Sequence, residues 1–151
     1  MDTSSNIFSK DIGQNTQIWQ YVIILKGAKI GSNCNIASHC FIENDVCIGN
    51  NVTIKNNVMI YDGVTIDNDV FIGPGVVFTN DRYPKSRRGG DKDFNLTKTK
   101  VFNNVSIGAN STILSNITIG EHSIIGAGSI ISKDVPPFSK IYGDSAKIQN
   151  N

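Results

Sequence analysis

The chain has 151 residues, a formal charge of +1 and 39% hydrophobic residues. This length fits one domain, residues 1–151, and the near-zero charge gives no reason to expect nucleic acid or an anionic membrane as a partner. No run of 18 apolar residues occurs, so no membrane span is predicted. The first residues, MDTSSNIFSKD, do not resemble a secretory signal, and we expect a cytoplasmic protein.

An aliphatic residue recurs at every sixth position from Asp11 to Thr79. The series is Ile12, Ile18, Ile24, Ile30, Ile36, Ile42, Ile48, Ile54, Ile60, Ile66, Ile72 and finally Phe78. Two positions before each of these from Ile24 onward stands Val, Ala or Cys. A period of six fits no helix, and 34 Ile and Val against three Leu favour strands. The pattern predicts very short strands that are stacked and separated by turns.

Three such hexads form a triangular coil of eighteen residues, so each residue stacks on the one eighteen places later. Glycine supports this grouping, because Gly13, Gly31 and Gly49 recur at that interval. Asn and Asp crowd the corners, where they tolerate a left-handed backbone. Residues 1–10 are a lead-in, and Ile7 is a candidate for a first incomplete rung.

The pattern breaks from Thr79 to Lys100, a stretch with seven basic and three acidic residues. A loop of this length is usually functional or disordered. Because regular rungs flank it, we expect an excursion that closes over something, with a disordered surface loop as the alternative. The rungs resume at Val101, so coils are predicted over about 11–78 and 101–135, nearly six in all. The pattern stops at Pro136–Pro137, and we expect residues 136–151 to cap the open edge.

Three cysteines raise the question of a metal site or a disulfide. Cys34 and Cys40 occupy the inward row, where other rungs have Val, and Cys47 lies one place off that row. Small buried hydrophobic residues explain the first two. No zinc-ligand spacing occurs, and an odd number of cysteines suggests reduced thiols. We therefore predict no metal.

The repeat [Ile/Val]-Gly-x-x-x-x resembles that of the hexapeptide-repeat acyltransferases, from Asp11 to Lys147. The resemblance implies a left-handed parallel β-helix. It also implies a homotrimer that binds acyl-CoA in clefts between neighbouring prisms. Neither the handedness nor the symmetry follows from the spacing.

Four segments narrow the resemblance: IWQYVIIL (18–25), NIASHCFIENDV (35–46), VMIYDGVTI (58–66) and FTNDRYPKSR (78–87). They resemble the sugar-nucleotide 3-amino N-acetyltransferases. The implied activity is acetyl-CoA-dependent acetylation of the 3-amino group of a dTDP-linked 3-amino-3,6-dideoxyhexose, for O-antigen or S-layer glycans. A UDP-linked amino sugar, or a sugar O-acetyltransferase activity, is the alternative.

The ending IGAGSIISKDVPPFSKIYGDSAK resembles the acetyl-CoA side of that family. The likeness implies that Gly126 and Ala127 offer backbone groups to the pantetheine arm. It also implies that Lys133 and Lys147 lie near the adenosine phosphates. The family more often has Asn-Pro-Ala where this chain has Asp144-Ser145-Ala146, which weakens the placement of Lys147.

Stacking by eighteen supplies an independent argument for a site. It aligns two neighbouring columns of side chains beside the start of the excursion: Lys26, Asn44, Asp62 and Asn80, and Leu25, Glu43, Tyr61 and Thr79. We interpret Asp62 and Asn80 as positioning the reacting sugar. The Asn80 amide can both donate and accept hydrogen bonds, so it could hold an amine or the acetyl carbonyl. Lys26, Glu43, Asn44, Tyr61 and Arg82 are the predicted substrate-binding residues. A plain solvated corner is the alternative.

His39 is the first candidate for a general base, because histidine titrates near neutral pH. Stacking places it in a column with Tyr21, Asn57 and Gly75. A nucleotide contact or a corner cap is the alternative role. An amine is nucleophilic without a base, so we expect direct attack on the thioester, promoted by proximity and by hydrogen bonds to the oxyanion.

Four basic residues of the excursion, Arg82, Lys85, Arg87 and Arg88, are candidates for phosphate contacts, with a solvated face as the alternative. Two other functions of this fold type fit the sequence poorly. A γ-class carbonic anhydrase needs three histidines for zinc, and this chain has two. A structural or ice-binding β-helix displays regular arrays, often of Thr, whereas the exposed positions here vary.

Overall fold

The computed structural model describes residues 4–86 and 95–143. Within these ranges the chain forms twenty strands of two or three residues. No helix in the described part is long and apolar enough to cross a membrane. The all-β class predicted from the hexads is confirmed.

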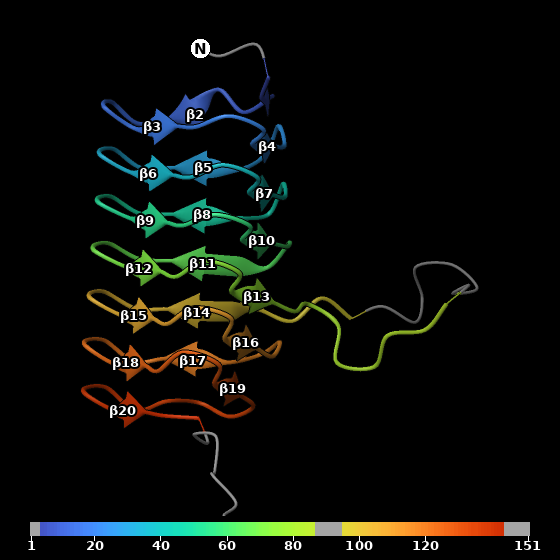
Figure 1. The fold of residues 1–151 in the computed structure, drawn as a ribbon. Coiled ribbons are helices and arrows are strands. Elements are labelled where there is room, and N and C mark those ends of the chain that lie inside the picture. Colours follow the sequence, from blue (N-terminus) through green and yellow to red (C-terminus); the bar gives the residue numbers. More distant parts are fainter. Residues whose placement is uncertain (1–3, 87–94, 144–151) are drawn as a thin grey trace, which may run out of the picture.

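The strands form three parallel sheets, which are the three sides of a prism (Figure 1). Sheet A contains β1 (Asn6–Ile7), β4 (Ile23–Ile24), β7 (Phe41–Ile42), β10 (Met59–Ile60), β13 (Val77–Phe78), β16 (Thr112–Ile113) and β19 (Ile130–Ile131). Sheet B contains β2 (Asp11–Ile12), β5 (Lys29–Ile30), β8 (Cys47–Ile48), β11 (Val64–Ile66), β14 (Thr99–Val101) and β17 (Thr118–Ile119). Sheet C contains β3 (Gln17–Ile18), β6 (Asn35–Ile36), β9 (Thr53–Ile54), β12 (Phe71–Ile72), β15 (Ser106–Ile107), β18 (Ile124–Ile125) and β20 (Lys140–Ile141).

Strand register confirms the coil of eighteen residues. Ile30 pairs with Ile48, and Ile48 pairs with Ile66. Across the excursion Ile66 pairs with Val101, thirty-five places later, so seventeen residues are inserted without disturbing the ladder. The excursion leaves the prism after β13 and returns at β14, and Figure 1 shows it extending sideways from the stack.

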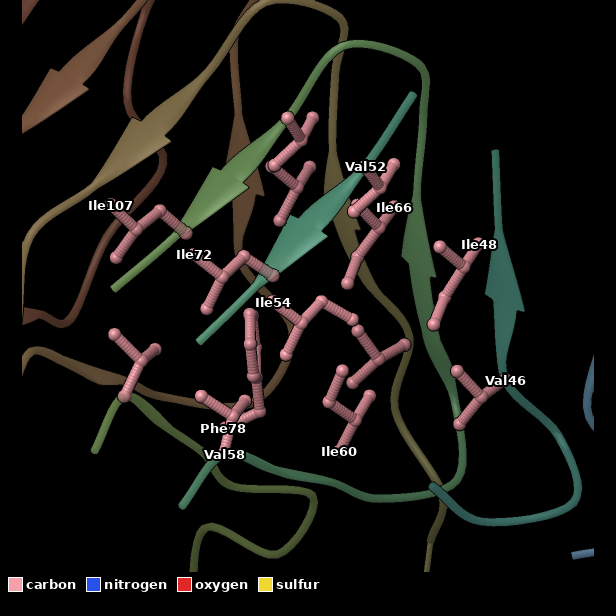
Figure 2. Close-up of a cluster of buried hydrophobic side chains, with 14 of the residues drawn as sticks. Val46, Ile48, Val52, Ile54, Val58, Ile60, Ile66, Ile72, Phe78 and Ile107 are labelled. Atoms are coloured by element: carbon pink, nitrogen blue, oxygen red, sulfur yellow. The ribbon is translucent and has the colours of Figure 1, made fainter. Parts of the chain in front are cut away.

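The core is a column of isoleucines, as the hexads predict. Ile54, Ile60 and Ile72 are fully buried, and Phe78 fills the same inward position at the end of β13 (Figure 2). Burial of each such side chain contributes roughly 1.5–3 kcal/mol before the entropy cost is subtracted. Cys34 and Cys40 are also buried, and burial raises the pKa of the Cys40 thiol.

The three edges of the prism differ in backbone conformation. Two edges carry columns of left-handed residues. The edge between sheets B and C has Asn15, Asn33, Asn51, Asp69, Asn104, His122 and Phe138, and the edge between sheets C and A has Tyr21, His39, Asn57, Gly75, Asn110 and Gly128. On the third edge, between sheets A and B, only Gly63 and Asn116 among the described residues have a positive φ. This third edge, called the A/B edge below, is the one from which the excursion leaves.

Both ends of the prism extend beyond the predicted coils. At the start, β1 pairs with β4, which confirms the rung at Ile7. At the other end, Val135 bridges to Ile119, and β20 pairs with β18. The ladder therefore continues to Ile141, past the expected stop at Pro136–Pro137, because the two prolines occupy a corner rather than a strand. Seven strands in each of sheets A and C also make the prediction of nearly six coils too short.

Candidate active site

The A/B edge carries the predicted column of polar side chains. The sheet A strands before it are in register, since Ile24 pairs with Ile42 and Ile42 with Ile60. Two places after these strand ends and after Phe78 come Lys26, Asn44, Asp62 and Asn80. The predicted alignment is therefore confirmed, while the roles assigned to these residues stay predictions.

Two side chains of this column accept hydrogen bonds from backbone N–H groups, which the spacing did not reveal. The Gly27 N–H donates to Asn44 Oδ1 at 3.1 Å, and the Asp45 N–H donates to Asp62 Oδ1 at 2.7 Å. Each side chain thus satisfies a donor on the coil before its own. A column of Asn and Asp at a corner can be recognised in sequence, but the spacing does not show which backbone donors these side chains bind.

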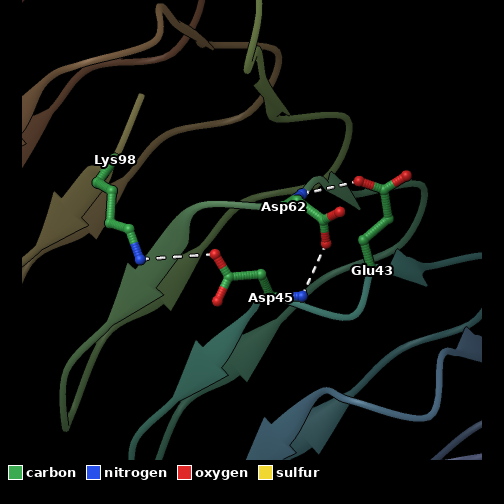
Figure 3. Close-up of polar contacts among 4 residues, drawn as sticks. All are labelled: Glu43, Asp45, Asp62 and Lys98. Carbon is green, nitrogen blue, oxygen red and sulfur yellow. Dashed lines mark hydrogen bonds and ion pairs between the residues drawn. The ribbon is translucent and has the colours of Figure 1, made fainter. Parts of the chain in front are cut away.

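Glu43 and Asp62 are connected (Figure 3). The Asp62 N–H donates to Glu43 Oε2 at 2.7 Å, and both side chains are half-buried. Tyr61 lies beside them, with its ring centroid 6.2 Å from that of Phe41. Lys98, where the excursion returns, forms an ion pair with Asp45 at 3.5 Å. The edge therefore presents carboxylates held at defined positions by backbone donors.

Asn80 differs from the residues above it in the column. It is half-buried, at the first turn of the excursion, and its amide makes no hydrogen bond to any described residue. Asn44 and Asp62 each bond to the preceding coil, so Asn80 is the column's amide left available for a ligand.

His39 lies on a different edge, between sheets C and A. Its φ is 64°, and its ring stacks on Tyr21 with centroids 5.0 Å apart and planes 22° apart. The predicted column of Tyr21, His39, Asn57 and Gly75 is confirmed by their shared positive φ. Within one chain, however, sheet A separates His39 from Asn80, so the fold does not bring these two candidates together.

The cofactor candidates are divided between the same two edges. Gly126 and Ala127 follow β18 on the edge between sheets C and A, whereas Lys133 follows β19 on the A/B edge. The Gly126 N–H donates to the Ile141 carbonyl, and the Gly126 carbonyl accepts from Ser129 Oγ at 2.7 Å. The backbone groups of Gly126 therefore make hydrogen bonds within the prism, and their expected contact with the pantetheine arm stays a prediction.

Ala127 remains a candidate for the expected backbone contact with the pantetheine arm. It is exposed, and its backbone N–H and carbonyl make no hydrogen bond to a described residue. An exposed N–H and carbonyl on one residue suit the amide groups of a pantetheine arm. Lys147 lies outside the described residues. Within residues 4–86 and 95–143, no group of three or more His, Cys, Asp and Glu side chains is placed to hold a metal ion.

The first residues of the excursion reach the last coils at the A/B edge. Arg82 Nη2 donates to the Ser132 carbonyl at 3.3 Å, although the two residues are fifty places apart. Between the excursion and the prism is a cavity of about 620 Å³. It is lined by Asp81, Arg82, Tyr83, Lys85, Asn95, Thr97, Ser115 and Asn116. Sequence reasoning found Arg82 and Lys85 but missed Thr97 and Ser115, which no motif distinguishes.

Comparison with known proteins agrees with this architecture. The model of the bacterial transferase hexapeptide family (six repeats) matches residues 10–44, 45–80 and 98–133. A dTDP-3-amino-3,6-dideoxy-α-D-galactopyranose 3-N-acetyltransferase of Aneurinibacillus thermoaerophilus is 50% identical over 93% of this chain and 72% of its own length.

Two solved structures are also similar. A hexapeptide-repeat acetyltransferase of Vibrio cholerae, solved with acetyl-coenzyme A, is 26% identical with a TM-score of 0.65, over 87% of this chain and 65% of its own. An N-acyltransferase of Bacillus cereus, solved with dTDP and coenzyme A, is 20% identical with a TM-score of 0.65, over 88% of this chain and 78% of its own. The second likeness shows the fold alone.

Proposed function

This chain belongs to the bacterial transferase hexapeptide family, and on that premise we propose that it is an acetyl-CoA-dependent N-acetyltransferase. The proposed substrate is a dTDP-linked 3-amino-3,6-dideoxyhexose, acetylated on its 3-amino group for O-antigen or S-layer glycan synthesis. The observation that carries the proposal is the 50% identity, over 93% of the chain, to a relative named for that reaction.

The proposed chemistry is direct attack of the neutral sugar amine on the thioester carbonyl of acetyl-CoA. A C–N bond forms, the C–S bond breaks, and the amine proton passes to the departing thiolate. In this proposal Asn80 holds the sugar or the acetyl oxygen, and Asp62, one oxygen of which accepts the Asp45 N–H, holds the sugar. The protein contributes orientation and hydrogen bonds to developing charge.

The separation of candidates on two edges supports a site shared between copies. Both edges border sheet A, whose outward row contains Ile23, Phe41, Met59, Val77 and Ile130. Of these, Ile23 is 38% exposed, Val77 40% and Ile130 72%. Burial of such an apolar row favours association of the homotrimer that we propose. A cleft between two copies would set the Asn80 edge of one opposite the Ala127 edge of the next.

We place the enzyme in the cytoplasm. All three cysteines are free thiols, which agrees with a reducing compartment.

The proposal is tested by mixing the protein with acetyl-CoA and one acceptor at a time, and following release of the CoA thiol. The acceptors are a dTDP-3-amino-3,6-dideoxyhexose, its 3-hydroxy counterpart and the UDP-linked amino sugar. Rapid release with the dTDP amino sugar is expected. Release with the hydroxy sugar alone would establish an O-acetyltransferase instead, and preference for the UDP sugar would reassign the nucleotide.

A further inference from the structure

The cavity beside the A/B edge contains two hydroxyl groups that make no hydrogen bond within the described part of the chain. Ser115 is only 1% exposed, and its hydroxyl makes no hydrogen bond to a described residue. Thr97 Oγ1 is buried and also lacks a hydrogen-bond partner among the described residues. Elsewhere in this fold buried serines are satisfied, since Ser111 and Ser129 both donate to the Gly126 carbonyl. An unpaired buried hydroxyl is costly, so Thr97 Oγ1, in one cavity wall with the unpaired Ser115 hydroxyl, indicates a ligand.

The charges around the cavity indicate what kind of ligand it accepts. Arg82 and Lys85 line it, and the Arg82 guanidinium is held in place through its bond to the Ser132 carbonyl. Asp81, the one carboxylate among the described residues of the wall, already accepts the Tyr83 N–H at 2.9 Å. Arginine, lysine and hydroxyl groups can all donate hydrogen bonds to an anion.

The position and the volume of the cavity further limit which ligand it accepts. Ser115 lies on the A/B edge one coil beyond Asn80, because Phe78 pairs with Ile113, and Lys133 lies one coil beyond Ser115. The cavity thus lies between the residue proposed to hold the sugar and a residue expected near CoA phosphates. Its volume of about 620 Å³ is within the range of sites for ligands of nucleotide size.

We propose that this cavity binds the phosphate chain of a nucleotide, with Ser115, Thr97, Arg82 and Lys85 as donors to the phosphate oxygens. The proposal deepens the function proposed above and rests on it. Two substrates of that reaction carry a diphosphate, the nucleotide sugar and CoA. We assign diphosphate binding to this cavity, and the experiment below shows whether the diphosphate belongs to the nucleotide sugar or to CoA.

The test uses the double variant Thr97→Val/Ser115→Ala, which removes the two hydroxyl groups while preserving side-chain shape. Its matched control is Thr53→Val/Ser106→Ala, the same two changes on the outward face of sheet C. Binding of dTDP and of CoA is measured separately by titration calorimetry, and thermal melting of the free proteins is recorded. No acceptor amine is present, so binding is assessed independently of whether acetyl transfer occurs.

We expect the double variant to melt no lower than the wild type and to bind one of the two probes about tenfold more weakly or worse. The control should bind both probes like the wild type. The weakened probe identifies the source of the diphosphate. Wild-type affinity for both dTDP and CoA would overturn the proposal. So would a clear drop in melting temperature, because it would show that the hydroxyls are satisfied within the protein.

Discussion

Asp62 provides a sharp test of whether the polar column does chemistry or only supports the corner. One of its oxygens accepts the Asp45 N–H at 2.7 Å, and that hydrogen bond stabilises the fold by about 1 kcal/mol. Asp62→Asn keeps an oxygen acceptor at this position but removes the charge. Asp62→Ala removes both. For a chain of this length, loss of the bond lowers the melting temperature by about 3 °C.

The two variants should therefore differ in stability but agree in activity. Asp62→Asn should melt close to the wild type, and Asp62→Ala a few degrees lower. If the carboxylate contacts the sugar, both should lose roughly 10- to 100-fold in kcat/KM, because a hydrogen bond to a charged group contributes about 1.5–3 kcal/mol. Thiol release from acetyl-CoA gives the rates, and thermal melting gives the stabilities.

A matched control lies on another edge. The Asn50 N–H donates to Asn68 Oδ1, also at 2.7 Å, between sheets B and C. Asn68→Ala should lower the melting temperature at least as much as Asp62→Ala, because Asn68 Oδ1 also accepts from Asn50 Nδ2 at 3.3 Å, and it should leave kcat/KM unchanged. Wild-type kcat/KM in Asp62→Asn would refute the reasoning, because Asp62 would then be a structural cap alone.

Three further predictions concern other parts of the prism. His39→Ala should lower kcat less than tenfold while removing the stack on Tyr21; a loss of 10² or more, with circular dichroism unchanged, would contradict attack without a base. Gly63→Ala should destabilise the protein by about 1–3 kcal/mol in chemical denaturation, because its φ is 90° and a Cβ would lie 2.7 Å from the Thr97 carbonyl oxygen; an unchanged denaturation midpoint would show that the corner relaxes. A thiol reagent should modify Cys47 alone in the native protein and all three thiols after denaturation, and fast native modification of more than one thiol would contradict the packing described for the inward row.

The regular part of the fold was predictable because one physical constraint acts at every rung. Each inward position must be filled by an apolar side chain, most often Ile or Val, so the hexads specify strands, coil length and core together. The ends were less predictable. Val135 and β20 continue the ladder after a shortened coil, in which Ile141 pairs with Ile125 sixteen places earlier, and a fixed period cannot show such a change.

The candidate site was predictable as an alignment but not as a set of contacts. Stacking placed Asn44, Asp62 and Asn80 in one column, yet it could not show that two of them accept backbone hydrogen bonds while the third does not. The cavity was missed for a related reason. Thr97 and Ser115 are eighteen places apart, and β14 pairs with β17 at that same spacing, but the rest of the cavity wall comes from the excursion, whose path follows no period.

The uninterrupted register between β11 and β14 has an evolutionary consequence. Ile66 pairs with Val101 as if the seventeen inserted residues were absent, so the hydrogen-bonded ladder places little demand on their number or composition. Substrate preference can therefore diverge through the excursion while the scaffold is inherited unchanged. Exchange of residues 81–97 between relatives would be the natural way to transfer specificity without rebuilding a core.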